Sequence, residues 1–268
     1  MTLSTAVSQL DHQDTSTADI VHSRCGVALP RVARQRSTVL HSSGTASPRA
    51  TGIEYSVRSF TARSQRERAT LESAFRLRAS VLVYELGWLL PNGIGIEQDR
   101  CDASATHVAA LAYLPGATTP TLAGYARVLL PRHGFMLRRE FAELLDETHI
   151  AFDETSAFEI SRMVVDPRFR GQRCREGRTV TEHLGRAIAG WALARGKTEC
   201  YTVCETRHIR ALQWRGIRFE RFGREVEYQR GVPVCAAVLR LTPLVDEWRE
   251  QRPADLAWYW GTSSWSAH

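Results

Sequence analysis

The pattern of apolar and polar positions changes at about residue 53. Before it, isolated apolar residues stand among serine, threonine, alanine and arginine, and no helical or strand period is sustained. Such a composition buries too little apolar surface to offset the entropy cost of ordering the backbone. We therefore predict a disordered leader over residues 1–52 that takes no part in the chemistry.

From residue 53 the pattern is regular enough to predict elements. Alternating or short apolar runs predict strands at residues 54–60, 107–114, 122–130, 158–165, 199–204, 224–229 and 234–241. Apolar residues three and four apart predict helices from Ser64 to about Leu86, over residues 135–145, from Thr181 to about residue 195, and from Thr206 to residue 214. Residues 89–106 have no period and are predicted to form a loop long enough to cover a site.

Strands that first pair antiparallel and later alternate with helices are typical of an α/β protein. We predict one domain over residues 53–245, built on a mixed sheet with antiparallel N-terminal strands and helices on both faces. The tail over residues 246–268 is rich in tryptophan but has no clear period. The pattern assigns this tail no structure.

Composition limits the cellular setting. The chain has 268 residues, of which 43% are hydrophobic, and this suffices for a substantial core. No apolar run approaches the roughly 18 residues that span a bilayer. The N-terminus also lacks the apolar stretch of a secretory signal. We predict a cytoplasmic protein with no membrane insertion.

Charge and cysteine content exclude further classes. The net charge of +6 comes from arginines interspersed with acidic residues, and no nucleic-acid-binding motif accompanies it, so we predict no nucleic-acid partner. An acidic protein or a phosphate-bearing ligand suits the same surface. The six cysteines include no C-x-x-C pair and lack zinc spacing, so we assign them no metal and no chemistry.

A set of charged residues interrupts segments that should fold together. Arg78 lies within the apolar arc of the first helix, Trp88 follows that helix, and Asp99 and Asp102 lie in the loop. Arg127 lies in an apolar strand. Because charges are seldom buried unless they are paired, we predict that the aspartates pair with the arginines in one site.

Several short motifs, in this order, resemble the LuxI-type acyl-homoserine lactone synthases (autoinducer synthases), a branch of the GNAT acyltransferase fold. The resemblance covers residues 75–242 and rests on RASVLVYELGW with Arg78 and Trp88, IEQDRCD with Asp99 and Asp102, GYARVLLP with Arg127, and EISRMVVD with Glu159 and Arg162. The chain departs from the family at Leu82, usually phenylalanine, and at Met163, where the strand usually reads E-x-S-R-F. Both departures keep apolar character and bear on the shape of the pocket.

The resemblance implies a GNAT-like sheet with a V-shaped opening and a reaction with two substrates. In this family an acyl group passes from a thioester of acyl carrier protein or coenzyme A to the amino group of S-adenosylmethionine. Lactone closure then expels methylthioadenosine, and no cofactor is implied. The residues implied are Glu159, Arg162, Asp99 and Asp102 as catalytic groups, and Arg78, Trp88, Arg127 and Leu82 as groups that bind S-adenosylmethionine and hold the loop.

Strand geometry constrains the EISR motif. An amine must be neutral to attack a thioester, so Glu159 is a candidate base, although it could instead only pair with an arginine. Regular alternation puts Glu159 and Arg162 on opposite faces of the strand. If both line one cavity, the strand must bulge, and the backbone N–H of Met163 or Val164 would then stabilise the thioester oxyanion.

Basic residues after this strand suggest a docking surface. Residues 168–175 lie where GNAT enzymes carry R-x-x-G-x-G/A for coenzyme A, but Arg173 replaces the second small residue, so only half of the motif is present. We predict that the cluster instead docks acidic acyl carrier protein, although solvated charges are equally consistent. The residues predicted to dock it are Arg138, Arg139, Arg168, Arg170, Arg173, Arg175 and Arg178.

Two other functions fit parts of the sequence. A general GNAT N-acyltransferase, using acyl or acetyl coenzyme A on another amine, fits the segment VVDPRFRGQ but leaves the Arg78, Asp99 and Arg127 set without a role. A non-enzymatic basic interaction module fits the charge but does not explain the motif around Glu159.

Overall fold

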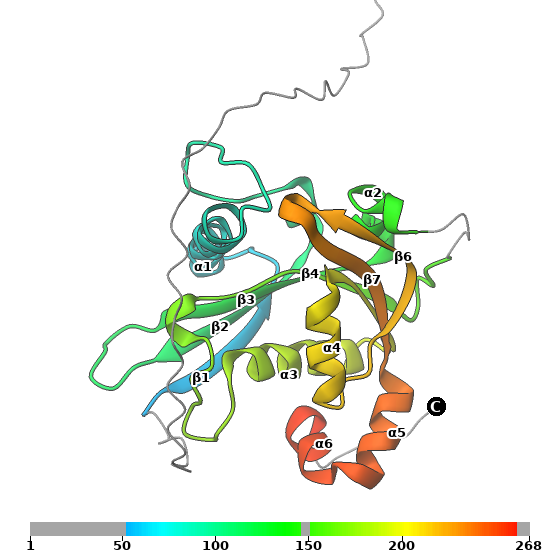
Figure 1. Cartoon of the computed structure of the whole chain (residues 1–268). Coiled ribbons are helices and arrows are strands. Elements are labelled where there is room, and N and C mark those ends of the chain that lie inside the picture. The colour runs from blue at the N-terminus through cyan, green and yellow to red at the C-terminus, as the bar shows by residue number, and fades with distance from the viewer. Residues whose placement is uncertain (1–51, 146–150, 262–268) are drawn as a thin grey trace, which may run out of the picture. The chain divides into compact units, whose positions relative to one another are not determined.

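The computed structural model describes residues 52–145 and 151–261. Its strands are β1 (Glu54–Phe60), β2 (Thr106–Tyr113), β3 (Thr121–Leu129), β4 (Ala157–Val165), β5 (Glu199–Glu205), β6 (Glu220–Tyr228) and β7 (Val232–Arg240). They form one sheet in the order β1-β2-β3-β4-β5-β7-β6 (Figure 1). Every predicted strand occurs. The predicted leader lies outside the described residues except for Gly52.

The sheet opens between β4 and β5, its only parallel pair of neighbours. Residues 157–160 of β4 pair with residues 199–202 of β5, and beyond that point β4 pairs only with β3 while β5 pairs only with β7. The two strands therefore diverge along their second halves. The predicted mixed sheet with antiparallel N-terminal strands and a V-shaped opening is confirmed.

Helices cover both faces of the sheet, as predicted. They are α1 (Gln65–Arg78), α2 (Met136–Arg139), α3 (Val180–Leu193), α4 (Thr206–Trp214), α5 (Leu241–Gln251) and α6 (Pro253–Trp260). In Figure 1, α1 and α2 lie on one side of the sheet, and α3 and α4 lie on the other. The largest apolar core packs Phe158 of β4 against Leu184 and Trp191 of α3, together with Trp248 of α5.

The long first helix changes its winding where it reaches the site. It is α-helical to Arg78 and continues as a π-helix over Ala79–Glu85, with the Leu86 amide bonded to the carbonyl of Val81. The helix predicted from Ser64 to about Leu86 is therefore confirmed at both ends, but its last seven residues are wound as a π-helix. No glycine or proline marks the change, and π-turns of this kind often occur at functional sites.

The helix predicted over residues 135–145 is broken. Only α2 is α-helical, and a 3₁₀ turn follows at Ala142–Leu144. The neighbouring β6 competes for this backbone, because Arg224 donates to the carbonyl of Glu143. At Gly223, whose φ is +65°, a side chain would collide with the Leu144 carbonyl. Contacts with a distant strand thus override the local helical pattern.

Two helix caps differ from those predicted. Helix α3 begins two residues earlier than expected, because Thr179 rather than Thr181 is its N-cap and forms a capping box with Glu182. Thr206 is the first residue of α4 rather than its cap. Its hydroxyl donates to Glu225 of β6 at 2.5 Å instead.

Replacing Thr179 by alanine is expected to lower the free energy of unfolding by about 1 kcal/mol, because the Glu182 amide loses its acceptor. Thr181→Ala is the matched control and should change it by less than about 0.5 kcal/mol. Urea denaturation followed by circular dichroism compares the two. Equal losses would contradict the assignment of the cap to Thr179.

The tail from residue 246, to which the sequence pattern assigned no structure, lies in α5 and α6 as far as Trp260. The indole of Trp248 donates to the Gly216 carbonyl at 2.9 Å, and Asp255 of α6 pairs with Arg178 at 2.9 Å. These contacts join the C-terminal helices to the rest of the domain. Within the part of the chain that the structure describes, no helix combines the length and apolar content needed to cross a bilayer.

Candidate active site

Three arginines and three carboxylates meet above the sheet, on the side of α1. They are Arg78, Arg127, Arg162, Glu97, Asp99 and Asp102. Arg78 and Arg127 have no exposed side-chain surface, and Asp102 has only 2%. The cluster is balanced in formal charge, which is the condition under which buried charges are tolerated.

Arg78, from the end of α1, is held by two carboxylates and two rings. Its Nη1 donates to Asp102 Oδ1 at 2.7 Å, and its Nε donates to Glu97. The rings of Phe75 and Tyr125 lie 5.1 and 5.8 Å from the guanidinium carbon. The arginine that interrupted the apolar arc of the first helix is therefore paired with two carboxylates, while its Nη2 lies 3.9 Å from Asp99 Oδ2 and has no hydrogen-bond partner among the described residues.

Arg127 of β3 shares the same aspartate. Its Nη1 donates to Asp99 Oδ1 at 2.5 Å and to Asp102 Oδ1 at 2.7 Å, and its Nε donates to Ser161 Oγ of β4 at 3.0 Å. Asp102 therefore accepts from Arg78 and Arg127 at one oxygen. The predicted pairing of two arginines with two aspartates is confirmed as a structural feature.

One tight turn orients both aspartates. Asp99 caps the 3₁₀ helix Arg100–Ser104 by accepting from the Cys101 amide at 2.9 Å, and Asp102 accepts from the Asp99 amide at 2.7 Å. Burial raises the pKa of Asp99, but the hydrogen bond from Arg127 and the charges of Arg127, Arg162 and Arg78 outweigh it. The pKa of Asp99 is therefore below its ordinary value, and its carboxylate is ionised at neutral pH.

Glu97 is a member of the cluster that the sequence analysis missed. Its carboxylate accepts from Arg78 and, at 3.2 Å, from Nε of Arg162. It lies in the same IEQDRCD segment as the two aspartates. The sequence did contain a signal for it. Three arginines were predicted in this site but only two aspartates, so a third carboxylate was needed to balance the charge.

A second pair missed from the sequence lies beneath the cluster. His107 Nδ1 lies 2.7 Å from the hydroxyl of Tyr125, and both side chains are buried. Burial lowers the pKa of His107 to about 4, with smaller effects from Asp102, Arg78 and Arg127. This imidazole is therefore neutral and adds no charge to the balanced set.

The bulge predicted in β4 is present. Tyr125 pairs with Val164 and Arg127 pairs with Ser161, so β4 has one residue more than β3 across this interval. The extra residue is accommodated at Arg162, whose φ is +54°, a conformation that non-glycine residues rarely adopt. The bulge lets the Arg162 side chain reach the cluster, where its Nη2 lies 3.0 Å from Asp99 Oδ2.

Glu159 is buried in β4 beside α2, with 1% of its surface exposed. Burial raises its pKa to about 8, although hydrogen bonds from the backbone amides of Leu137 and Met136 act in the opposite direction. Its Oε2 has no hydrogen-bond partner among the described residues. This carboxyl group can therefore exchange a proton near neutral pH, as a general base must.

The contribution of Glu159 to the stability of the protein is expected to fall as the pH rises from about 5 to about 8. Glu159 keeps its proton in the folded state up to a pKa of about 8, whereas the ordinary value is 4.5. Between these two pKa values, Glu159 is protonated in the folded chain and ionised in the unfolded chain. Raising the pH through this window therefore favours unfolding. Urea midpoints measured across the window should fall more in the wild type than in Glu159→Gln; equal slopes would contradict the shifted pKa.

The apolar residues predicted to bind substrate lie next to the cluster. Leu82 is buried with Tyr125 and Val164, and Trp88 packs against the same group while remaining half-buried. The Trp88 amide donates to the Leu82 carbonyl at 2.8 Å, which ties the residue after the π-helix back to it. Of the predicted oxyanion donors, Met163 is 38% exposed and Val164 is buried.

The structure does not bring the seven predicted docking arginines together. Arg138 and Arg139 lie on α2, where Arg138 stacks on Phe152 at 4.8 Å, and the other five lie in residues 168–178, beyond the far end of β4. Several are already paired within the chain. These pairs are Arg168 with Asp166, Arg170 with Glu85, and Arg178 with Glu182 and Asp255.

A surface depression of about 460 Å³ lies between α1 and the loop around residues 94–98. Its walls include Leu71 and Phe75 of α1 and Ile96 and Gln98 of the following loop. Between these loop residues, Glu97 turns inward to the charge cluster. The loop thus lies between the depression and the cluster. The candidate site is therefore placed at Glu159 and Arg162 of β4 and not in this depression.

The open mixed sheet, which splits between β4 and β5, has the GNAT-like fold. The fold resembles that of the acyl-homoserine lactone synthase LasI, with a TM-score of 0.55 and 22% identity over 72% of this chain and 91% of LasI. It also resembles that of BjaI, a coenzyme A-dependent acyl-homoserine lactone synthase, with a TM-score of 0.59 and 19% identity over 72% of this chain and 89% of BjaI. The chain belongs to the autoinducer synthase family, whose model matches residues 62–246.

A curated relative supports the same assignment. An acyl-homoserine-lactone synthase from Rhizobium radiobacter is 32% identical over 175 residues, which are 64% of this chain and 79% of the relative. The family and the enzyme class predicted from the sequence motifs are therefore confirmed. The roles of individual site residues stay predictions.

Proposed function

We propose that this enzyme makes an N-acyl homoserine lactone signal from S-adenosylmethionine and an acyl thioester, and releases methylthioadenosine. The observation that carries the proposal is the balanced charge cluster beside the β4 bulge, in a chain of the autoinducer synthase family. A general N-acyltransferase would have no use for this assembly. No resident cofactor is needed, because both reacting molecules are substrates.

Glu159 is the proposed base of the first step. It removes a proton from the ammonium group of S-adenosylmethionine, and its unpartnered Oε2 provides the acceptor. The neutral amine attacks the thioester carbon, the new C–N bond forms, and the C–S bond breaks to release the thiol. The carboxylate of the acylated intermediate then attacks its own γ-carbon, which closes the lactone and expels methylthioadenosine.

The partly exposed edge of the cluster is the proposed contact for S-adenosylmethionine. Asp99 and Arg162 keep 22% and 13% side-chain exposure, whereas Arg78, Arg127 and Asp102 are buried behind them. An anionic Asp99 suits the cationic substrate, and Arg162 suits its carboxylate. Arg78, Arg127, Asp102 and Glu97 then act as positioning residues, while Leu82 and Trp88 supply apolar wall.

The V-shaped opening is the proposed place for the acyl thioester. It lies beside the bulge, where the backbone N–H of Met163 or Val164 would stabilise the oxyanion of the tetrahedral intermediate. BjaI, whose structure is described with S-adenosylmethionine and isopentyl-CoA, has the same fold. An acyl group on coenzyme A or on acyl carrier protein would present the same thioester chemistry.

One assay tests the proposal. Purified protein is incubated with S-adenosylmethionine and a panel of acyl-coenzyme A and acyl carrier protein thioesters, and products are identified by mass spectrometry. Methylthioadenosine and an acyl lactone in equal amounts are expected. An acylated amine without methylthioadenosine would replace the proposal by a general N-acyltransferase, and binding without turnover would make the chain an interaction module.

Raising the salt concentration is expected to raise the KM for an acyl carrier protein thioester more than that for a short neutral thioester. The exposed Arg138 and Arg139 of α2 would contact an acidic carrier, and salt screens such contacts. Steady-state kinetics at two salt concentrations measure the effect. Equal sensitivity of both donors would remove the docking role of these arginines.

A further inference from the structure

A second polar group lies away from the charge cluster, where the chain between β4 and α3 turns back toward α3. It consists of Cys174, Glu176 and His183, whose side-chain ligand atoms all lie within 4.8 Å of one another. Cys174 Sγ is 3.4 Å from His183 Nε2. Cys174 and His183 are buried, and Glu176 is exposed at the edge. The proposed reaction uses none of the three.

The local fold brings these residues together. The Cys174 amide donates to the Arg178 carbonyl at 2.8 Å, and the Gly177 amide donates to the Cys174 carbonyl at 2.9 Å, so residues 174–177 form a tight turn. An isolated bridge between Arg173 and Thr179 closes this turn. The capping box at Thr179 then starts α3, which places His183 in its first turns, above Cys174.

The surroundings contain an independent sign of a ligand. The hydroxyl of Tyr55 is buried without a hydrogen-bond partner among the described residues. The Tyr55 ring meets the ring of His183 edge-on at 5.4 Å. Because an unsatisfied buried hydroxyl is costly, a deprotonated thiolate or a bound water at this place would remove the cost.

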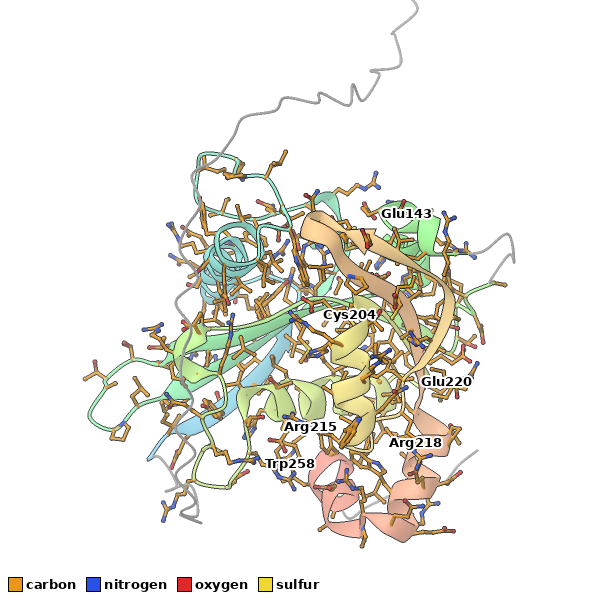
Figure 2. The ribbon with its side chains drawn as sticks, viewed as in Figure 1. Glu143, Cys204, Arg215, Arg218, Glu220 and Trp258 are labelled. Atoms are coloured by element: carbon orange, nitrogen blue, oxygen red, sulfur yellow. The ribbon has the colours of Figure 1, made fainter. Side chains whose placement is uncertain are left out.

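Trp258 of α6 supports the same group from the opposite side. Figure 2 shows its indole between α6 and α3. It meets His183 edge-on at 5.3 Å, and its Nε1 lies 3.4 Å from Glu176 Oε2. Outer groups that orient ligands in this way are usual around protein metal sites.

We propose that Cys174, His183 and Glu176 bind one zinc ion, with water as the fourth ligand. Thiolate, imidazole and carboxylate are zinc ligands, and tetrahedral zinc at about 2.3 Å from sulfur and about 2.05 Å from nitrogen separates these two atoms by about 3.6 Å. The observed 3.4 Å is close to that edge. A thiol–imidazole hydrogen bond would also give this distance, but it leaves the buried Tyr55 hydroxyl without a partner.

The ion would fasten the start of α3. Its ligands Cys174 and Glu176 belong to the turn before α3, and His183 belongs to α3 itself. Tyr55 of β1 and Trp258 of α6 do not bind the ion but contact the ring of His183. The site is therefore structural in character. No metal was predicted from the sequence because C-x-x-C is absent, and this ligand set has the spacing C-x-E followed by a distant histidine.

Metal content of the purified full chain tests the proposal. The protein is incubated with zinc chloride, dialysed, and measured by mass spectrometry of the metal. Wild type is expected to hold about one zinc per chain, and Cys174→Ser and His183→Asn less than about a tenth of that. Cys204→Ser is the matched control and should keep its zinc, since Cys204 lies on β5, apart from Trp258 (Figure 2).

Cobalt substitution keeps the test decisive if a variant fails to fold. Wild type loaded with cobalt chloride should show a thiolate-to-cobalt charge-transfer band, and zinc should raise its Tm. The proposal is overturned if wild type binds no stoichiometric zinc, if its cobalt form lacks the band, or if Cys174→Ser and Cys204→Ser hold equal zinc. These readouts are independent of turnover, so they stand apart from the proposed acyl transfer.

Discussion

Glutamine in place of Glu159 is expected to lower kcat by about 100-fold to 10,000-fold, while the chain stays folded. Glutamine has the same shape but cannot accept the proton of the substrate ammonium group. The fold should tolerate it, since Glu159 is buried and, with a pKa of about 8, largely neutral at pH 7 in the free enzyme. The KM for S-adenosylmethionine should change little, because Asp99 and Arg162 are the proposed binding groups.

The measurement is the rate of methylthioadenosine release between pH 6 and 9, with the Tm of each variant. Wild-type kcat should rise with pH as Glu159 deprotonates, and the residual rate of Glu159→Gln should lack that rise. Glu143→Gln, a change at an exposed glutamate that follows α2 (Figure 2), is the control. Wild-type turnover in Glu159→Gln would place the base elsewhere.

The largest loss of stability is expected from Asp102→Asn, which should lower the free energy of unfolding by about 3 to 5 kcal/mol. Asp102 Oδ1 accepts from both Arg78 and Arg127, and both guanidiniums are fully buried. The amide removes the negative charge and leaves the cluster with one uncompensated buried positive charge. Its –NH₂ group also cannot accept the bond that Oδ2 takes from the Asp99 amide.

Urea denaturation measures this loss against two comparisons. Asp246→Asn alters an exposed pair with Arg249 and should change stability by less than about 1 kcal/mol. Asp99→Asn should keep most of the chain folded, because Asp99 is the more exposed of the two aspartates. It should nevertheless abolish turnover, because Asp99 is the proposed contact for S-adenosylmethionine. If Asp102→Asn unfolded at the same urea concentration as Asp246→Asn, the cluster would contribute little to the fold.

The strands and the charge cluster were predictable because their signals are local or chemical. Alternation identified each strand, and Arg78 within an apolar arc required carboxylates that Asp99 and Asp102 supply. The bulge in β4 followed from the need to place Glu159 and Arg162 beside one site, and the pairing register shows it. The cap at Thr179 could also have been predicted in place of Thr181, because Glu182 stands three residues after Thr179 and completes a capping box.

Other features depend on contacts between distant segments. Glu97 lies in a loop without a period, where a glutamate is ordinarily solvated, and only folding places it against Arg78 and Arg162. The π-helix after Arg78 has no glycine or proline to announce it. The break after α2 follows from β6, a strand far along the chain, through Arg224 and Gly223.

The sharing of Asp102 by two arginines limits how this enzyme can evolve. A change at any of Arg78, Arg127 or Asp102 alone leaves a buried charge without its counter-ion, so a viable route through sequence space needs two or more substitutions at once. Neutral neighbours such as Leu82 and Trp88 carry no such penalty. New acyl or adenosyl preferences should therefore arise by stepwise mutation of the apolar wall, while the ionic centre stays fixed.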